Sequence, residues 1–149
     1  RILSDAGSSG SLRNTGTVEG NGDFIFEMFT DPLQDHLVSV PVAGATGGPL
    51  AAGQLWEWLE PQGYWLELND PFYLPGSFKG FRIYTTSASQ TIEWPGEAFH
   101  SGIYSLPLTN NGSQNGHAGG FNLAGNPYPS AINWNSAEGW VLNQVDSDC

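Results

Sequence analysis

Three glutamates within one short aromatic stretch are the side chains of this sequence whose spacing best suits catalysis. Glu57, Glu60 and Glu67 lie in QLWEWLEPQGYWLEL, residues 54–68. Two carboxylates about 5–10 Å apart across a groove can hydrolyse a glycosidic bond, and a hairpin in this stretch would bring Glu57 toward Glu67. Acids on the open face of a hairpin are more commonly solubilising side chains, because proximity in sequence does not create the geometry of a site. We therefore assign no catalytic residue.

Other patterns of catalysis and metal binding are missing from the sequence. It has no GxSxG, HExxH or CxxC motif and no glycine-rich phosphate loop. The three histidines stand in distant segments without the spacing of metal ligands, at His36, His100 and His117. We expect a protein that is not an enzyme and that has neither a metal site nor another cofactor.

Calcium at acidic turns is the one alternative to this expectation. NGD, DPLQD and DSD, at residues 21–23, 31–35 and 146–148, carry carboxylates of the kind that bind Ca²⁺. The alternation of Asp and Asn before Gly that marks a calcium loop is missing. Asp, Asn and Gly also favour turns for backbone reasons alone, so solvated turns are the preferred interpretation.

Aromatic residues in the same stretch suggest a second kind of site, a flat apolar platform for sugar rings. Trp56, Trp58, Trp65 and Tyr64 are its candidate residues. The competing interpretation is that large aromatics fill a β core, where each buries on the order of 150–250 Å². In LWEWL, Trp56 and Trp58 share one face and the leucines share the other, as expected of a strand between a core and a cover. We favour the core and keep the platform as the alternative.

The overall composition is that of an acidic β protein. The 149 residues include 20 glycines and 10 prolines, which suit short strands and many turns. Fifteen acids against four Lys or Arg give a formal charge of −11, and such a field repels nucleic acid and anionic lipid. No apolar run is long enough to cross a membrane. Charged residues form only 13% of the chain, a profile that leans toward extracellular proteins.

Strand-like runs follow one another at short intervals, each bounded by turn residues. They comprise residues 23–29, 36–42, 54–60, 64–68, 78–85, 90–94, 102–108 and 120–123. The three residues PQG are expected to form a hairpin loop with glycine in the last position. The pattern predicts an all-β fold, a jelly-roll-like β-sandwich of roughly eight to ten short antiparallel strands. At most one short helix is expected, at residues 130–140.

Alternation along two of these runs predicts which side chains share a face of the strand. In residues 36–42, Val38, Val40 and Val42 share one face. Residues 23–29 place Phe24, Phe26 and Met28 together in the same way. Prolines at positions 41, 95 and 107 mark edges, bulges or strand ends, because proline removes a ladder donor.

The stretch GFNLAGNPYPSAINW, residues 120–134, cannot be a regular helix or strand along its whole length. Its prolines fix φ and prevent further pairing, while Gly125 and Asn126 tolerate a left-handed backbone. Ser130 would cap a short helical turn that brings Trp134 back over the sheet. We interpret this stretch as a rigid structural corner rather than a ligand loop. Its residues are Gly125, Asn126, Pro127, Tyr128, Pro129, Ser130 and Trp134.

Taken in order, several segments resemble a β domain of large secreted and cell-surface proteins of Bacteroidetes, found upstream of type IX secretion sorting domains. The segments are GSLRNTGTVEG, HLVSVPV, QLWEWLEPQGYW, GFRIY and GGFNLAGNPYPSAINW. The last fits the motif GFNLxGNPYPSAIxW and is the most specific. Arg13, His36, Asn133 and Asn135 depart from the residues usual in that family. The resemblance implies a secreted or cell-surface location and carries over no catalytic residue.

We expect residues 1–16 to be a flexible leading segment or linker and residues 17–149 to be a single β-sandwich domain, a piece of a larger secreted protein. Its expected role is a non-catalytic structural or adhesion module that meets neighbouring domains of the same polypeptide or other copies of itself. No nucleic acid or membrane insertion is expected. The alternative is a carbohydrate-binding accessory module of a secreted polysaccharide-degrading enzyme, with glycans as partners. Cys149, the single cysteine, allows no internal disulfide and is expected to be incidental or to pair outside this segment.

Overall fold

Strands dominate the fold. The computed structural model describes residues 2–3, 7, 23–46, 54–73, 75–76, 78–86, 88–113, 115–116, 119–133 and 141. Across these residues it has no helix and eight strands, β1 (Phe24–Thr30), β2 (Asp35–Val38), β3 (Val42–Ala43), β4 (Gln54–Leu59), β5 (Tyr64–Glu67), β6 (Phe81–Tyr84), β7 (Gln90–Gly96) and β8 (Ala98–Phe99). Every pairing between them is antiparallel. The predicted all-β fold of roughly eight to ten strands is confirmed.

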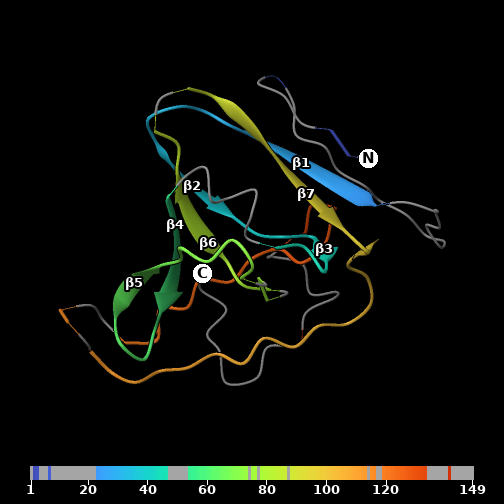
Figure 1. Ribbon diagram of the computed structural model, residues 1–149. Coiled ribbons are helices and arrows are strands. Elements are labelled where there is room, and N and C mark those ends of the chain that lie inside the picture. The colour runs from blue at the N-terminus through green and yellow to red at the C-terminus, as the bar shows by residue number, and fades with distance from the viewer. Residues whose placement is uncertain are drawn as a thin grey trace.

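The strands are arranged in a sandwich-like way (Figure 1). One sheet has four strands in the order β2-β6-β4-β5, and β1 pairs with β7 in a second layer. A small third sheet joins β3 to β8. After β6 the chain leaves the four-stranded sheet, and β7 pairs with β1 in the second sheet.

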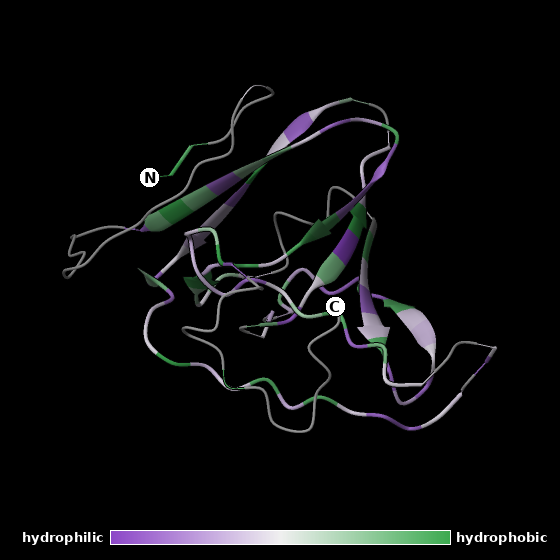
Figure 2. Ribbon diagram, turned by 180° about the vertical axis from the view of Figure 1, so that it is seen from behind, coloured by the Kyte–Doolittle hydropathy of each residue, from purple (hydrophilic) through white to green (hydrophobic). Residues whose placement is uncertain are grey.

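The hydrophobic core lies between these layers. Its buried members come from both layers, from β3 and from the irregular positions 40 and 45 beside β3: Val38, Val40, Val42, Ala45, Leu55, Phe81, Ile83, Ile92 and Trp94. Phe24, Phe26 and Met28 pack against this cluster, and Leu37 on the opposite face of β2 is 67% exposed. The core therefore includes the face of residues 36–42 that carries the three valines and the face of β1 that carries Phe24, Phe26 and Met28, and Figure 2 shows that apolar and polar residues occur within the same strands.

The β4–β5 hairpin forms where the sequence predicts it, with a slightly longer turn. The last cross-strand pair is Leu59 with Tyr64, so the turn covers residues 60–63 and includes Glu60, which we had expected at the strand end. Gly63 closes the turn with a φ of 64° and donates its backbone N–H to the Leu59 carbonyl at 2.8 Å. This positive φ explains why glycine stands there.

Two predicted strands are wrong. Residues 102–108 and 120–123 form no regular strand, although Ala124 makes an isolated antiparallel bridge to Lys79. Together they belong to a long irregular stretch, residues 100–133, which we call the C-terminal segment and which runs along the lower side of Figure 1. Ile103 in this stretch is 99% exposed, whereas Tyr104 and Leu106 are half-buried.

The predicted helix at residues 130–140 is not present over residues 130–133, and the rest of it, including Trp134, lies outside the described residues. Pro95 lies within β7, which among the described residues pairs only with β1, as expected of proline near a sheet edge. Most of residues 1–16 lie outside the described part, but Ile2 forms a parallel bridge with Phe26 of β1. No helix among the described residues is long and apolar enough to span a membrane.

Candidate functional site

Three hairpin tryptophans lie on the outer side of the four-stranded sheet. Register places Trp58 opposite Trp65, and Trp56 opposite both Glu67 and Arg82. Because side chains alternate along a strand, Leu55 and Glu57 then face the core, and both are buried. A different tryptophan, Trp94 of β7, is fully buried in the core. Trp56, Trp58 and Trp65 are instead half-buried on the opposite side.

An arginine covers part of this tryptophan face. The Arg82 guanidinium carbon lies 4.8 Å from the centre of the Trp56 ring and 5.8 Å from that of Trp65. Arg82 also donates two hydrogen bonds to Asp35, from Nε to Oδ1 at 2.8 Å and from Nη2 to Oδ2 at 3.0 Å. The planar guanidinium is suited to both contacts at once. We call Trp65, Trp56, Arg82 and Asp35 the arginine ladder.

The remaining members of the predicted sugar platform are engaged or turned away. Trp58 packs edge-to-face on Trp65 and Phe121, with ring centres 5.4 Å apart in each pair, and its Nε1 donates to the Phe121 carbonyl at 2.6 Å. Tyr64 pairs with Leu59 and therefore points to the side of the sheet opposite Trp65. The structure thus brings together Trp56, Trp58 and Trp65 but not Tyr64.

Glu57 is the first of two buried acids near this hairpin. Its Oε2 accepts a hydrogen bond from the Tyr73 hydroxyl at 2.8 Å, and its Oε1 forms an ion pair with Lys79. Burial, and then the neighbouring Glu57 carboxylate, raise the pKa of Tyr73 well above its usual range. Glu67 lies on the outer face with Trp56, so the two carboxylates considered for glycoside hydrolysis point to opposite sides of the sheet.

Glu60 is the second buried acid, and it holds the C-terminal segment against the hairpin turn. It accepts hydrogen bonds from Thr109 Oγ1 at 2.6 Å, from the Asn111 backbone and side-chain amides at 2.8 and 2.7 Å, and from the Gly120 backbone at 2.9 Å. These donors, Thr109 first, lower the pKa of Glu60 to about 2. The side-chain amide of Asn111 is thus hydrogen-bonded within the fold.

The corner predicted at residues 125–130 is closely packed. Pro127 is fully buried. Ser39 Oγ donates to the Asn126 carbonyl at 2.7 Å, and Asn126 Oδ1 accepts from the Tyr128 backbone N–H at 3.0 Å. Both X-Pro peptides of the corner are trans.

The reason for glycine at the corner differs from the one we predicted. Neither Gly125 nor Asn126 has a positive φ. A Cβ at position 125 would lie 2.5 Å from the Lys79 carbonyl oxygen and from Ser39 Cβ, so glycine permits a close approach of two chain segments. The corner therefore depends on contact distance, not on left-handed backbone.

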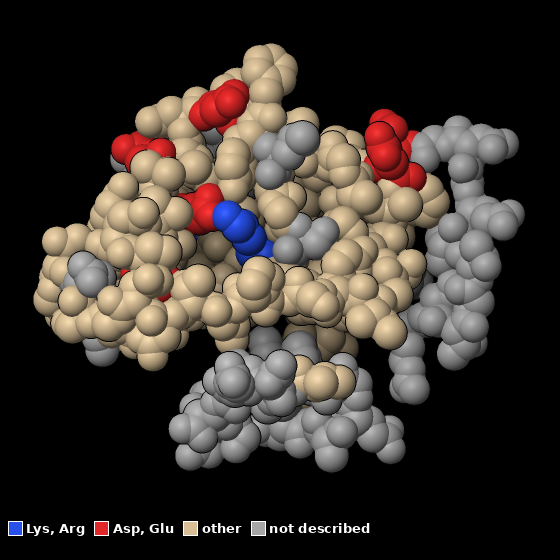
Figure 3. Space-filling view, turned by 90° about the horizontal axis from the view of Figure 1, so that it is seen from below, with Lys and Arg blue, Asp and Glu red and all other residues tan. Residues whose placement is uncertain are grey.

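In the part of the chain that the structure describes, acidic and potentially metal-binding side chains are mostly scattered. No group of three or more His, Cys, Asp or Glu residues there is placed to hold a metal ion. Of the acidic turns considered for calcium, residues 31–35 are described, whereas residues 21–22 and 146–148 fall outside. Figure 3 shows one face on which acidic side chains lie apart and basic side chains form a single cluster beside an acid.

Sequence reasoning missed the residues that organise these sites. Arg82 and Lys79 have no role in the sequence prediction, Tyr73 is considered only as a further aromatic for a sugar platform, and Glu60 is assigned only as one of three hairpin acids. The one signal that the sequence offered was the scarcity of basic residues. With four Lys or Arg against fifteen acids, each basic side chain has an excess of acids to pair with. Comparison of the chain with protein-family models, with curated proteins and with solved structures gives no match.

Proposed function

We propose that the chain is a non-catalytic extracellular module that serves structure or adhesion in a large type IX-secreted surface protein or surface assembly. The arginine ladder is the observation that supports this most. In this ladder the Arg82 guanidinium covers part of the aromatic outer face of the sheet, and the Asp35 carboxylate holds the guanidinium in place. Both groups belong to the module itself. Such a face is rigid without any ligand. The extracellular location rests on the resemblance of residues 120–134.

The two buried glutamates support the same proposal. Glu57 is occupied by Tyr73 and Lys79, and Glu60 by Thr109, Asn111 and Gly120. A general acid or base needs a pKa near the working pH and access to a substrate proton. The low pKa of Glu60 and its full set of donors make it an anchor for the C-terminal segment.

Adhesion assays on beads test this proposal. One population is coated with the purified chain and a second with the adjoining domains of the full-length polypeptide, and denatured chain serves as the control coating. We expect clustering of chain-coated beads with each other or with the second population. Incubation of the chain with polysaccharides, esters and peptides should release no product. Clustering in neither arrangement, or release of product, would contradict the proposal.

Carbohydrate binding is the second candidate, and one observation favours it. Trp56, Trp58 and Trp65 share the outer side of one sheet, where indoles can stack on sugar rings once Arg82 moves or shares the surface. Pull-down with insoluble polysaccharides tests it, with the W58A/W65A double variant and Phe72→Ala as a control aromatic elsewhere. Binding lost in the first variant and kept in the second would support a sugar site. The absence of binding to every polymer would eliminate it.

A further inference from the structure

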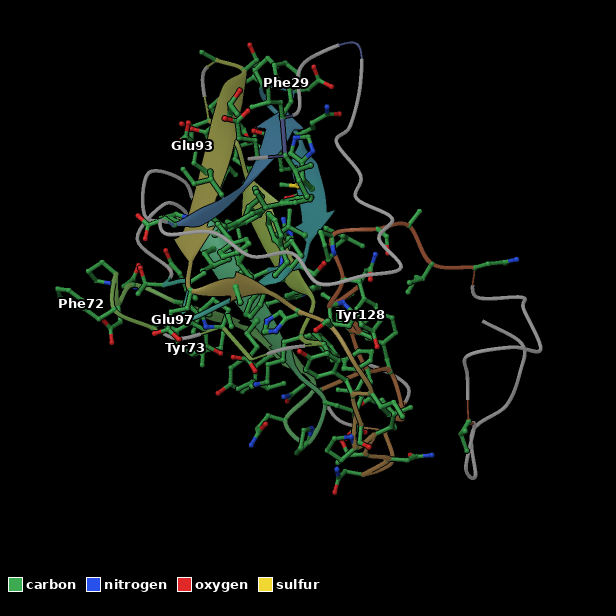
Figure 4. All side chains as sticks on the ribbon, turned by 90° about the vertical axis from the view of Figure 1, so that its right-hand side faces the viewer. Phe29, Phe72, Tyr73, Glu93, Glu97 and Tyr128 are labelled. Carbon is green, nitrogen blue, oxygen red and sulfur yellow. The ribbon has the colours of Figure 1, made fainter. Side chains whose placement is uncertain are left out.

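Phe72 is an aromatic side chain presented to solvent by a fixed turn. It is 79% exposed, the most exposed aromatic ring among the described residues. Figure 4 shows it at the outer end of its turn, away from the strands. Burying a phenylalanine is worth about 1.5–3 kcal/mol, so a fold that leaves one in water has no use for it in its own core.

The turn that carries Phe72 is rigid for three reasons. The Phe72 backbone N–H donates to Asp70 Oδ1 at 2.8 Å, and the Tyr73 N–H donates to the Asp70 carbonyl at 3.1 Å. Pro71 fixes φ at the position between them. Tyr73 then ties the end of the turn to buried Glu57 and packs edge-to-face on Phe81, with ring centres 6.1 Å apart.

A rigid exposed ring is suited to act as a binding anchor. Interface hot spots are aromatic or arginine side chains that enter a pocket, and their effect is larger when little conformational freedom is lost on binding. Ile103 is even more exposed than Phe72, but within the described residues no hydrogen-bonded turn like that of residues 70–73 holds it. Ile103 is therefore the matched control, an apolar side chain that is exposed but is not held by such a turn.

Charge around the turn defines the partner. Asp70 and Glu67 are exposed acids close to Phe72 in sequence, and the chain as a whole has a formal charge of −11. A complementary surface is therefore basic. A second copy of this chain does not fit, because it has four Lys or Arg against fifteen acids, and the described ones, Lys79 and Arg82, are already in ion pairs.

We propose that Phe72 is the anchor of a heterotypic docking site, and that it inserts into an apolar pocket rimmed by Lys or Arg on a protein or domain of different sequence. This inference rests on the proposed adhesive function and selects one class of partner for it. The acids of the turn would pair with the rim while the ring fills the pocket. Membranes are disfavoured, because anionic headgroups repel an acidic surface.

Amino-substituted β-cyclodextrin is a chemical probe for such a pocket, since its apolar cavity admits a phenyl ring and its rim carries ammonium groups. We expect it to bind the chain about tenfold more tightly than neutral β-cyclodextrin, with Phe72 signals shifted in NMR spectra. F72A should abolish binding and Ile103→Ala should leave it unchanged. The D70N/E67Q variant should remove the preference for the amine. Binding that survives F72A, or equal affinity for the two cyclodextrins, would overturn the proposal.

Photo-crosslinking in the full-length secreted protein tests the partner itself. A photoreactive phenylalanine is placed at position 72, with position 103 as the matched control. We expect crosslinks specific to position 72 that map to an apolar site containing Lys or Arg on another domain or protein. Crosslinks to lipid, to a second copy of this chain, or to nothing beyond the control would refute it. Bead clustering that persists in F72A would leave the adhesive function standing and remove only Phe72 from it.

Discussion

Glu60 and Asn111 are joined by two hydrogen bonds, one from the Asn111 backbone N–H at 2.8 Å and one from its side-chain amide at 2.7 Å. The pair connects the tight turn of the β4–β5 hairpin to a segment 51 residues later in the chain. With Thr109 and Gly120 it forms the anchor that holds the irregular C-terminal segment against the sheet.

Glu60→Gln is expected to lower the thermal midpoint of unfolding and to change its response to acid. The pKa of Glu60 is lowered from its usual 4.5 to about 2 in the folded protein. A depressed carboxylate pKa contributes stability that is complete above pH 4.5 and is lost as the pH falls toward 2. Denaturation curves across this window should show the wild type converging on the variant. A constant difference at every pH would argue against the anchor.

Tyr73→Phe is expected to destabilise the protein by about 1–3 kcal/mol, because it leaves Glu57 Oε2 buried without its donor. The raised pKa of Tyr73 adds a pH effect of the opposite direction to that of Glu60. The contribution of the Tyr73 hydroxyl to the free energy of unfolding is complete below pH 10, the usual tyrosine pKa. It is lost as the pH rises through the pKa of Tyr73 in the folded protein. Urea titrations from pH 8 upward measure this, and Tyr64→Phe on the same hairpin is the control. An identical alkaline response in Y73F and wild type would contradict the assignment.

Gly125→Ala is expected to destabilise the protein by about 1–3 kcal/mol through overpacking against Lys79 and Ser39. Gly76→Ala is the matched control, since its added Cβ would lie 3.5 Å from the nearest atom, in ordinary contact with a flexible lysine side chain. Replacing Pro127 together with Gly125 should lower thermal stability further, because Pro127 is fully buried. Chemical denaturation of the purified variants measures both effects, and equal midpoints for G125A and G76A would count against a tightly packed corner.

Arg82→Lys is expected to lower the free energy of unfolding by about 1 kcal/mol, although charge is conserved. Lysine cannot make the two parallel hydrogen bonds to Asp35 while lying flat over Trp56 and Trp65. A double-mutant cycle with D35N separates the exposed ion pair, worth about 0–1 kcal/mol and weakened by salt, from the contact with the indoles. A fully additive cycle would mean that Asp35 does not position the guanidinium.

Local sequence patterns correctly predicted the strands that pair with a neighbouring strand in the fold. Alternation in residues 36–42 and 23–29 grouped the side chains that share a face, because a period of two is a property of each strand alone. The strand predicted at residues 102–108 does not form. That stretch finds no partner strand among the described residues, and the C-terminal segment is held instead by side-chain hydrogen bonds to Glu60.

The contacts of the candidate site could not be predicted from local sequence patterns, because they join residues that are distant in the chain. Arg82 reaches Trp56 only because β6 pairs with β4 in one particular register. Tyr73 and Lys79 meet Glu57 across separations of 16 and 22 residues. The glycine at position 125 was recognised as special, but its reason, the approach of Lys79 and Ser39, requires the tertiary structure.

The parallel bridge of Ile2 on β1 affects how the fold bears mechanical load. Ile2 donates its N–H to the Ile25 carbonyl and accepts from the Glu27 N–H, each at 2.9 Å. Tension applied through the N-terminal end of the chain reaches these two bonds before it reaches the antiparallel β1–β7 ladder. The two hydrogen bonds join Ile2 to a parallel strand and lie across the strand direction. A pull along the strand therefore loads both bonds in shear at the same time. When the N-terminal end is pulled, this contact is therefore the first mechanical clamp on β1.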